Sequence, residues 1–162
     1  VAIAFLMSTI DVIRRAARPD TAALVEAPDR SHFVAAAVGQ DSGTPGLVVY
    51  RFGAPLYFAN ATLFVEEIER LATQGPAPIR WFVLDAEAMV DVDTTGAESL
   101  RQVMTLLAER GITLAVSRAS QPFRTWLERY ELLERIGLDR FYPTNRHAAV
   151  AFRGEREKGI PT

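Results

Sequence analysis

The segment 91–98, with the sequence DVDTTGAE, holds the residues of this chain whose types and spacing best suit chemistry. It joins the apolar run 79–84 to a stretch with helical periodicity, so it predicts a turn at the N-terminus of a helix. Backbone N–H groups and the helix dipole at such a turn can hold an anion. A phosphate on Thr94 or Thr95 would be stabilised by the dipole and repelled by Asp93, which describes a switch.

A simpler interpretation of the same segment is a well-capped helix. Thr95 and Glu98 have the spacing of a capping box, in which two side chains satisfy free backbone N–H groups of the first turn. Physical chemistry alone leaves both interpretations open. In either case Gly96 falls on the side of the helix predicted to face the sheet, so Gly96→Val is expected to overpack that contact.

Four carboxylates surround the same turn, those of Asp85, Glu87, Asp91 and Asp93. Carboxylates gathered at one edge of a sheet can bind Mg²⁺. They are also ordinary turn residues, because Asp side chains accept hydrogen bonds from nearby backbone N–H groups. A magnesium site and a plain turn therefore remain alternatives.

Other catalytic chemistry finds little support in the residue types present. The chain has no cysteine, which excludes a thiol nucleophile and a Cys-ligated zinc site. It contains no glycine-rich phosphate-binding loop and no Gly-x-Ser-x-Gly elbow. Neither His32 nor His147 has a nucleophile or ligand partner nearby in sequence. We predict that the chain is not an enzyme, with nucleotide hydrolysis at the acidic cluster as the weaker alternative.

Length and composition limit the class of protein. The 162 residues, 49% hydrophobic and 23% charged, suit one folded domain with a single core. The formal net charge is only −2, which gives no general attraction to nucleic acid or to an anionic membrane. We therefore predict no nucleic-acid partner. No metal is assigned to the chain either.

Apolar runs and helical periodicity alternate along the chain and predict an α/β fold. The first two predicted strands are expected to form a pair joined by a loop. Strands are predicted at 33–38, 47–52, 79–84 and 112–116, with a brief segment at 140–142. Helices are predicted after the N-cap Asn60, from Gly96 to Gly111, from Phe123 to Gly137, and around His147 and Phe152.

The N-terminal residues are apolar in an unusual position. Residues 1–7 form an unbroken apolar run, and Arg14, Arg15 and Arg18 follow it. A signal peptide carries its positive charge before the apolar run, whereas this order suits the end of a transmembrane helix that leaves into the cytoplasm. An ordinary amphipathic helix or a fragment boundary is the alternative. A linker is predicted at 19–30, a domain at 31–153 and a flexible tail at 154–162.

Two segments resemble STAS domains, named for sulfate transporters and anti-sigma-factor antagonists. The unit of strand, Asp93, Thr94, Thr95, Gly96 and helix is similar to the family signature, whose phosphorylatable hydroxyl residue immediately precedes the glycine. The segment 55–61 looks like one typical of STAS domains at the C-terminus of SulP-type anion permeases. Its family-like residues are Phe58, Ala59, Asn60 and Ala61. The resemblance covers about residues 31–152.

The resemblance implies a STAS-like α/β fold, with a central, mostly parallel sheet of about four strands layered with four to five helices. It also implies a cytoplasmic regulatory domain of a multi-pass transporter for sulfate or a related inorganic anion, at the cytoplasmic face of the inner membrane. The implied partners are the transmembrane domain of the same transporter, regulatory proteins or a kinase, and a second copy in a homodimer of the parent transporter. A guanine or adenine nucleotide is the implied candidate ligand. The alternative is a soluble partner-switching antagonist phosphorylated at Thr95.

Overall fold

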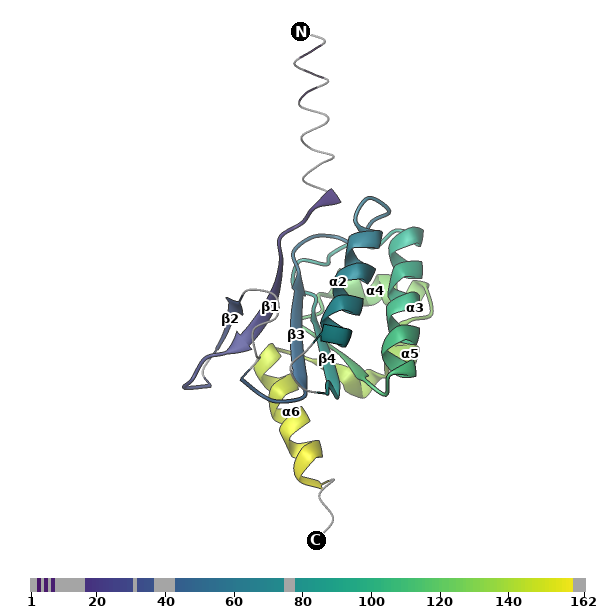
Figure 1. The fold of residues 1–162 in the computed structure, drawn as a ribbon. Helices are drawn as coiled ribbons and strands as arrows, with labels where there is room; N and C mark the ends of the chain where they lie inside the picture. The colour runs from purple at the N-terminus through teal and green to yellow at the C-terminus, as the bar shows by residue number, and fades with distance from the viewer. Residues whose placement is uncertain are drawn as a thin grey trace.

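The fold comes from a computed structural model that describes residues 3, 5, 7, 17–30, 32–36, 43–74 and 78–158. Six strands and five α-helices lie within these residues (Figure 1). In chain order the elements are β1 (Thr21–Glu26), β2 (Phe33–Ala36), β3 (Leu47–Phe52), α2 (Ala61–Gln74), β4 (Trp81–Asp85), α3 (Thr94–Glu109), β5 (Thr113–Ser117), α4 (Gln121–Arg129), α5 (Leu133–Ile136), the 3₁₀ turn η1 (Leu138–Arg140), β6 (Phe141–Tyr142) and α6 (Asn145–Lys158).

All six strands belong to one mixed sheet, in the order β2-β1-β3-β4-β5-β6. Strands β3 to β6 are parallel to one another, and β1 is antiparallel to both β2 and β3. The parallel pairs place the carboxyl ends of β3, β4 and β5 at one edge of the sheet. Since β1 runs the other way, with Thr21 opposite Phe52, its N-terminal end lies at that same edge.

The sheet separates two apolar layers of different size. The larger layer contains buried side chains from α2 to α5 and from one face of the sheet, including Phe64, Leu100 and Phe123. The smaller layer packs α6, through Ala148, Ala149 and Phe152, on the opposite face. Every residue of β4 is buried, because helices cover this central strand from both sides.

The α/β class and the parallel core of the sheet are confirmed. The strand predicted at 47–52 has those bounds, and β4 and β5 begin and end within two residues of the predicted runs. Five helices lie in the described part of the chain. The parallel strands β3 to β6 number four, but the complete sheet is larger and mixed.

The predicted linker at 19–30 is wrong for Thr21–Glu26, which form β1 in the interior of the sheet. Leu24 is 1% exposed and packs in the α6 layer. Consequently the strands at 33–36 and 47–52 are not a pair, because β1 lies between them. Alanine-rich composition and flanking prolines concealed this strand, whose stability comes from pairing on both sides rather than from strong β-propensity.

The predicted tail is wrong in its first part. Residues 154–158 continue helix α6, which ends at Lys158; residues 159–162 lie outside the described residues. Most of the predicted transmembrane stub, residues 1–16, also lies outside them, apart from Ile3, Phe5 and Met7. Among the helices that can be described, none is long and apolar enough to cross a membrane.

Candidate functional site

The structure brings the segments 55–61 and 93–96 together at the carboxyl edge of the parallel strands. Leu56, after β3, forms a parallel bridge with Val92, after β4. The N–H of Leu56 donates to the carbonyl of Asp91 at 3.0 Å, and its carbonyl accepts from the N–H of Asp93 at 3.2 Å. This short backbone ladder joins two segments that are far apart in the sequence.

Asp93 strengthens the junction with its side chain. Its Oδ1 accepts from the N–H of Gly96 at 2.7 Å and so caps helix α3. Its Oδ2 accepts from the N–H of Phe58 at 2.9 Å. The predicted capping box is therefore wrong: helix α3 begins at Thr94, its cap is Asp93, and Thr95 lies inside the first turn.

Gly96 is required by the close approach of the two segments. A Cβ atom at this position would lie 2.2 Å from the carbonyl oxygen of Leu56 and 2.9 Å from its carbonyl carbon. Gly96 was predicted on the side of the helix that faces the sheet; it is buried, but its near contact is the loop after β3 rather than a strand. The group it faces is the backbone of residue 56, which cannot rotate away as a side chain could.

Asn60 holds the loop before α2 in shape. Its side-chain oxygen accepts from the N–H of Tyr57 at 3.0 Å, and its side-chain nitrogen donates to the carbonyl of Pro55 at 3.0 Å. Asn60 is 1% exposed, and Ala61, the first residue of α2, is also buried. Ala59 is half-buried. Three of the four residues in 58–61 thus support the loop, and Phe58 is the one that it presents.

The surface of this junction carries Phe58, Thr94 and Thr95. The Phe58 side chain is 74% exposed, and both threonines are exposed. Tyr57 lies beside them and donates from its hydroxyl to Oδ2 of Asp91 at 2.7 Å. This hydrogen bond holds the pKa of the Tyr57 phenol above its ordinary value. The buried members of the site thus hold a surface of exposed hydroxyls and an exposed aromatic ring.

The four-carboxylate cluster expected at this turn does not form one site. Asp91 and Asp93 belong to the junction, whereas Asp85 is buried beneath α6. In the part of the chain that can be described, no three His, Asp or Glu residues are arranged to hold a metal ion. The plain-turn alternative fits Asp91 and Asp93, because their carboxylates accept from the nearby backbone N–H groups of Val92 and Gly96.

Asp85 is the centre of a separate charge network. Both of its oxygens contact the Arg118 guanidinium, one at 2.9 Å from Nε. Arg51 Nε lies 3.2 Å from its Oδ2, and Asn145 Nδ2 lies 3.0 Å from the same oxygen. Burial alone would raise the pKa of Asp85, but the bonds from Arg118, Asn145 and Arg51 hold it below the ordinary value. Arg118 also pairs with Glu87 at 2.7 Å.

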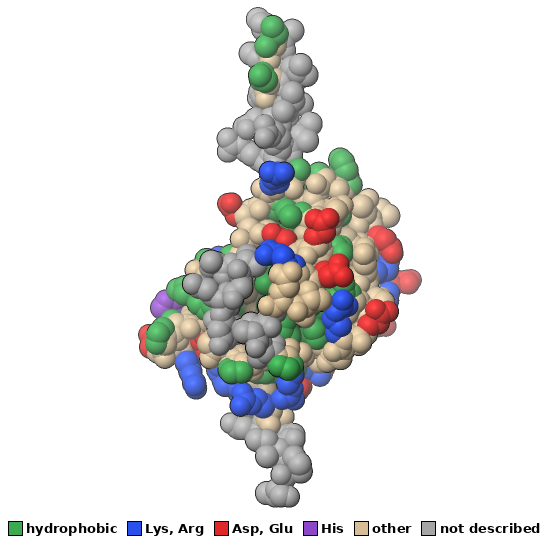
Figure 2. Space-filling view, in the orientation of Figure 1, with side chains coloured by type: hydrophobic (Ala, Val, Ile, Leu, Met, Phe, Trp, Pro, Cys, Tyr) green, Lys and Arg blue, Asp and Glu red, His purple; other side chains and the backbone are tan. Residues whose placement is uncertain are grey.

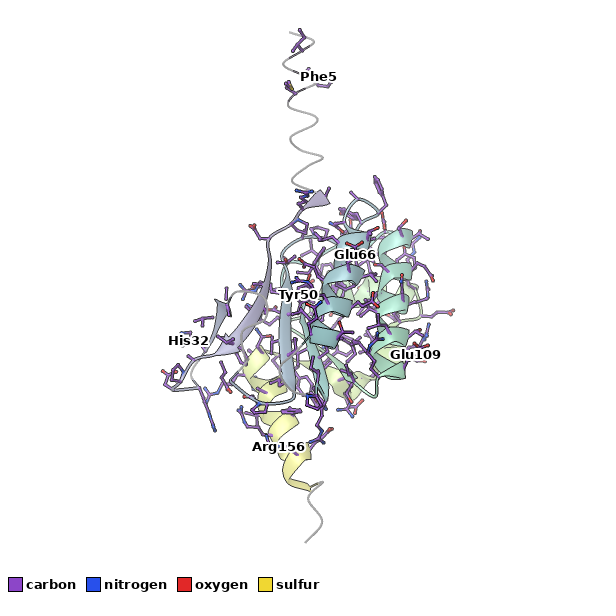
Figure 3. All side chains as sticks on the ribbon, in the orientation of Figure 1. Phe5, His32, Tyr50, Glu66, Glu109 and Arg156 are labelled. Carbon is purple, nitrogen blue, oxygen red and sulfur yellow. The ribbon has the colours of Figure 1, made fainter. Side chains whose placement is uncertain are left out.

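A third set of contacts fastens the segment before β1 to the same edge of the sheet. The N–H of Gly53 donates to the carbonyl of Asp20 at 2.9 Å, and a Cβ on Gly53 would lie 2.3 Å from that oxygen. Glu67 of α2 accepts from Thr21 at 3.1 Å and from the buried Tyr50 at 2.5 Å. Burial and this bond raise the pKa of Tyr50. In Figure 3 Tyr50 lies between β3 and α2.

Two backbone N–H groups that an anion could bind at the start of α3 already have acceptors. Oδ1 of Asp93 accepts from the N–H of Gly96, and the backbone carbonyl of Asp93 accepts from the N–H of Ala97. A phosphate bound in solution would have to displace a carboxylate of the same charge sign. The hydroxyls of Thr94 and Thr95 remain accessible to covalent modification, because both residues are exposed.

Sequence reasoning missed the Asp85 network and the contacts of residues 20 and 21. Their members come from different elements, and only the strand register brings them together: Arg51 pairs with Asp85, and Asp85 with Ser117. A polar residue within the last two positions of each of three successive apolar strands (Arg51, Asp85 and Ser117) was the available signal. The two histidines that were set aside are also separate, with His32 before β2 and His147 in α6 beside Thr144.

The sequence matches a known protein family and named relatives. The STAS domain family model matches residues 40–148. A Mycobacterium tuberculosis protein named "Probable sulfate transporter Rv1739c" is 38% identical over 158 residues, which cover 93% of this chain and 27% of that protein. The chain thus spans about a quarter of the length of this relative.

Solved structures share the fold. The murine Solute Carrier 26 family member A9 anion transporter matches with a TM-score of 0.80 over 94% of this chain and 25% of that chain, at 16% identity. The STAS domain of a SulP transporter from Vibrio cholerae matches with a TM-score of 0.61 over 71% of this chain and 87% of that chain, at 23% identity. At such identities the likeness shows the fold alone.

Proposed function

The chain belongs to the STAS domain family, and from this membership we propose that it is the cytoplasmic regulatory domain of a SulP-type anion transporter. Sulfate is the proposed anion, because the relative at 38% identity is named as a sulfate transporter. The domain acts through protein contacts and neither transports nor catalyses.

One observation carries this proposal: the segments 55–61 and 93–96 form a single junction. Its buried residues hold the two loops together, and its exposed side chains lie on the surface. Gly96, Asn60 and Asp93 hold the junction through short backbone contacts. Phe58 and the two threonines lie on its surface. A rigid base with exposed hydroxyl and aromatic side chains suits a contact surface, whereas a catalytic site needs groups free to react.

The relatives and the N-terminal sequence support the proposed membrane location. The match to the mycobacterial protein covers 93% of this chain. The remaining 7% of 162 residues is about 11, so the match includes Arg14, Arg15 and Arg18 wherever the unmatched residues lie before the domain. The segment with these arginines supports attachment to a membrane domain on the cytoplasmic side.

Thr95 is the proposed point of control. It is exposed in the first turn of α3 and is not the helix cap, so a kinase can reach its hydroxyl without unfolding the helix. A phosphate there adds about two negative charges beside Asp93. The soluble antagonist alternative is less favoured, since the relatives that share most of this chain are transporters.

Uptake of labelled sulfate by the longer protein tests the proposal. We expect a protein whose chain ends before residue 17, and which therefore lacks this domain, to reach the membrane and to transport sulfate at an abnormal rate. We expect Thr95→Glu to alter the uptake rate without changing the amount of protein in the membrane. Thr105→Glu, also exposed and placed further along α3, is the matched control and should leave uptake unchanged. Normal uptake by the truncated protein would refute a regulatory role.

A further inference from the structure

The Asp85 network leaves hydrogen-bond donors of Arg51 unused. Arg51 donates through Nε to Oδ2 of Asp85 at 3.2 Å, and its two terminal nitrogens form no hydrogen bond or ion pair with any described residue. Most N–H donors of a guanidinium belong to those two nitrogens. The Arg51 side chain is 37% exposed, whereas Asp85 beneath it is fully buried, so the unused donors lie on the outer side of the network.

A second guanidinium lies beside Arg51. Arg118 donates through Nε to Oδ1 and through Nη2 to Oδ2 of Asp85, and Oδ2 is the oxygen that Arg51 also contacts. Two cations that share one oxygen repel each other unless negative charge offsets them. Asp85 supplies one negative charge, and Glu87, paired with Nη1 of Arg118 at 2.7 Å, supplies the other. The cluster thus holds two charges of each sign.

Glu87 is the replaceable member of this cluster. Its side chain is 59% exposed, and an exposed ion pair contributes little because water and salt weaken it. The backbone N–H of Glu87 donates to Oδ1 of Asp85 at 3.3 Å, a contact that does not involve its carboxylate. The Glu87 side chain can therefore leave Arg118 while the buried part of the network stays in place.

The backbone at Arg118 holds its guanidinium in a fixed position. Arg118 has a φ of 54°, in the left-handed region that residues with a Cβ rarely adopt. Its N–H donates to the carbonyl of Tyr142 at 3.0 Å. Strain of this kind persists where the surrounding contacts enforce it, and it gathers at binding sites. A guanidinium fixed in advance loses less freedom when it binds a ligand.

The surface as a whole gives no general attraction to anions. The formal net charge of the chain is −2, and Figure 2 shows acidic and basic side chains interspersed over α2 and α3. An anion would therefore be selected by local donors. The planar edge of a guanidinium matches a pair of oxygens on one ligand, which a tetrahedral oxyanion offers and a monatomic ion does not.

We propose that Arg51 and Arg118 bind a tetrahedral oxyanion, of the class of sulfate and phosphate, in place of the Glu87 carboxylate. Asp85 also accepts from Asn145 at the start of α6, so the site lies on the side of the sheet that α6 covers. It is separate from the junction of segments 55–61 and 93–96. The proposal does not rest on a role in transport, so the failure of either leaves the other standing.

Titration of the chain with sodium sulfate, followed by NMR of the arginine Nε–H groups, tests this site. Sodium chloride keeps the ionic strength constant. We expect saturable shifts of the Arg51 and Arg118 signals with sulfate and with phosphate, and none when chloride is added to the same ionic strength. Shifts that never saturate, or that chloride reproduces, would indicate an adventitious ion only and would overturn the proposal.

Removal of the free guanidinium is the first variant arm. Arg51→Gln should abolish the saturable shift of Arg118. The matched control is Arg110→Gln, because Arg110 is exposed to a similar extent and also pairs with an exposed carboxylate, that of Glu69; it should leave the shift unchanged. The same pair separates binding from the general stabilising effect of sulfate on proteins. Loss of saturation in both variants, or in neither, would refute the assignment.

Removal of the competing carboxylate is the second variant arm, and it leaves the bonds to Asp85 intact. Glu87→Gln should lower the dissociation constant for sulfate about two- to fivefold, the size of an exposed ion pair. Glu98→Gln is the matched control, because Glu98 pairs with Arg101 as Glu87 does with Arg118, and should leave the constant unchanged. An unchanged or higher constant for Glu87→Gln would overturn the exchange of Glu87 for an oxyanion.

Discussion

Two carboxylates at the same edge of the sheet are used in opposite ways. Asp93 accepts from two backbone N–H groups, those of Phe58 and Gly96, and lies under an exposed surface. Asp85 is fully buried and accepts from the side chains of Arg51, Arg118 and Asn145. The first joins two loops, and the second joins strands β3, β4 and β5 to helix α6.

The difference shows how this domain separates its stability from its contacts. A buried carboxylate without its partners is strongly unfavourable, so the Asp85 network cannot change without cost to the whole sheet. The junction at Asp93 depends on backbone bonds, so the side chains of Phe58, Thr94 and Thr95 can change while the junction persists. The proposed regulation therefore belongs at the Asp93 junction rather than at Asp85, and the following predictions test that division.

The largest effect is expected at Asp85. Asp85→Ala removes the partner of two arginines and leaves the Asn145 amide without its acceptor, so unfolding free energy should fall by about 3–5 kcal/mol. Chemical denaturation of the chain measures this. Asp85→Asn, which keeps the size of the side chain, is the control, and a fall below about 1 kcal/mol for the alanine variant would contradict the assigned role.

The same network has a defined pH dependence. Because the folded-state pKa of Asp85 is lowered, its contribution is complete above the ordinary Asp value and is lost as the pH falls through the folded value. The stability difference between the native chain and Asp85→Asn should therefore shrink as the pH falls from about 5 to about 3. A difference that grows in acid would reverse the assigned sign.

A smaller effect is expected at the junction. Gly96→Val places a branched side chain against the Leu56 carbonyl, where a Cβ alone would be 2.2 Å away, and should lower stability by about 2–3 kcal/mol. Gly154→Ala is a helical control with open space around it, and should stabilise by up to about 1 kcal/mol. Thermal melts of both variants decide whether the approach of the two segments is tight.

The Asp93 cap has the next effect in size. Asp93→Ala removes the acceptor for Gly96 and Phe58 and should lower stability by about 1–2 kcal/mol. Asp93→Asn should retain most of it, since its carbonyl oxygen can still cap. Equal losses in the two variants would mean that the negative charge, rather than the acceptor geometry, is what matters.

The smallest effect is expected at Thr95. Thr95→Ala should change stability by less than about 0.5 kcal/mol, because the side chain is exposed and Asp93 already caps the helix. A loss as large as that of Asp93→Ala would restore the capping box predicted from the sequence.

Sequence reasoning succeeded where local pattern and burial agree. The apolar runs of β3, β4 and β5 and the buried side of Gly96 were predictable because each depends on neighbours in the sequence. The sequence placed the helix cap at Thr95, two residues after the observed cap Asp93, because each of the three residues 93–95 can cap a helix. Local pattern cannot choose among them, whereas the bond from Phe58, remote in sequence, favours Asp93.

The missed features depend on pairing between distant segments. Strand β1 has few β-branched residues, and its place is decided by hydrogen bonds to β2 and β3. The approach of Leu56 to Gly96 and the convergence of Arg51 and Arg118 on Asp85 both require the parallel register. Both family-like segments were named from the sequence, but their union into one surface was not.

The most direct test of the account is the initial rate of labelled sulfate uptake by the proposed full-length transporter with Phe58→Ser, beside Leu138→Ser as an apolar control of similar exposure. The rate is divided by the amount of each protein in the membrane. The account predicts an altered rate for Phe58→Ser and an unchanged rate for Leu138→Ser. Equal, unchanged rates in the two variants would contradict the claim that the exposed side chains of this junction regulate transport.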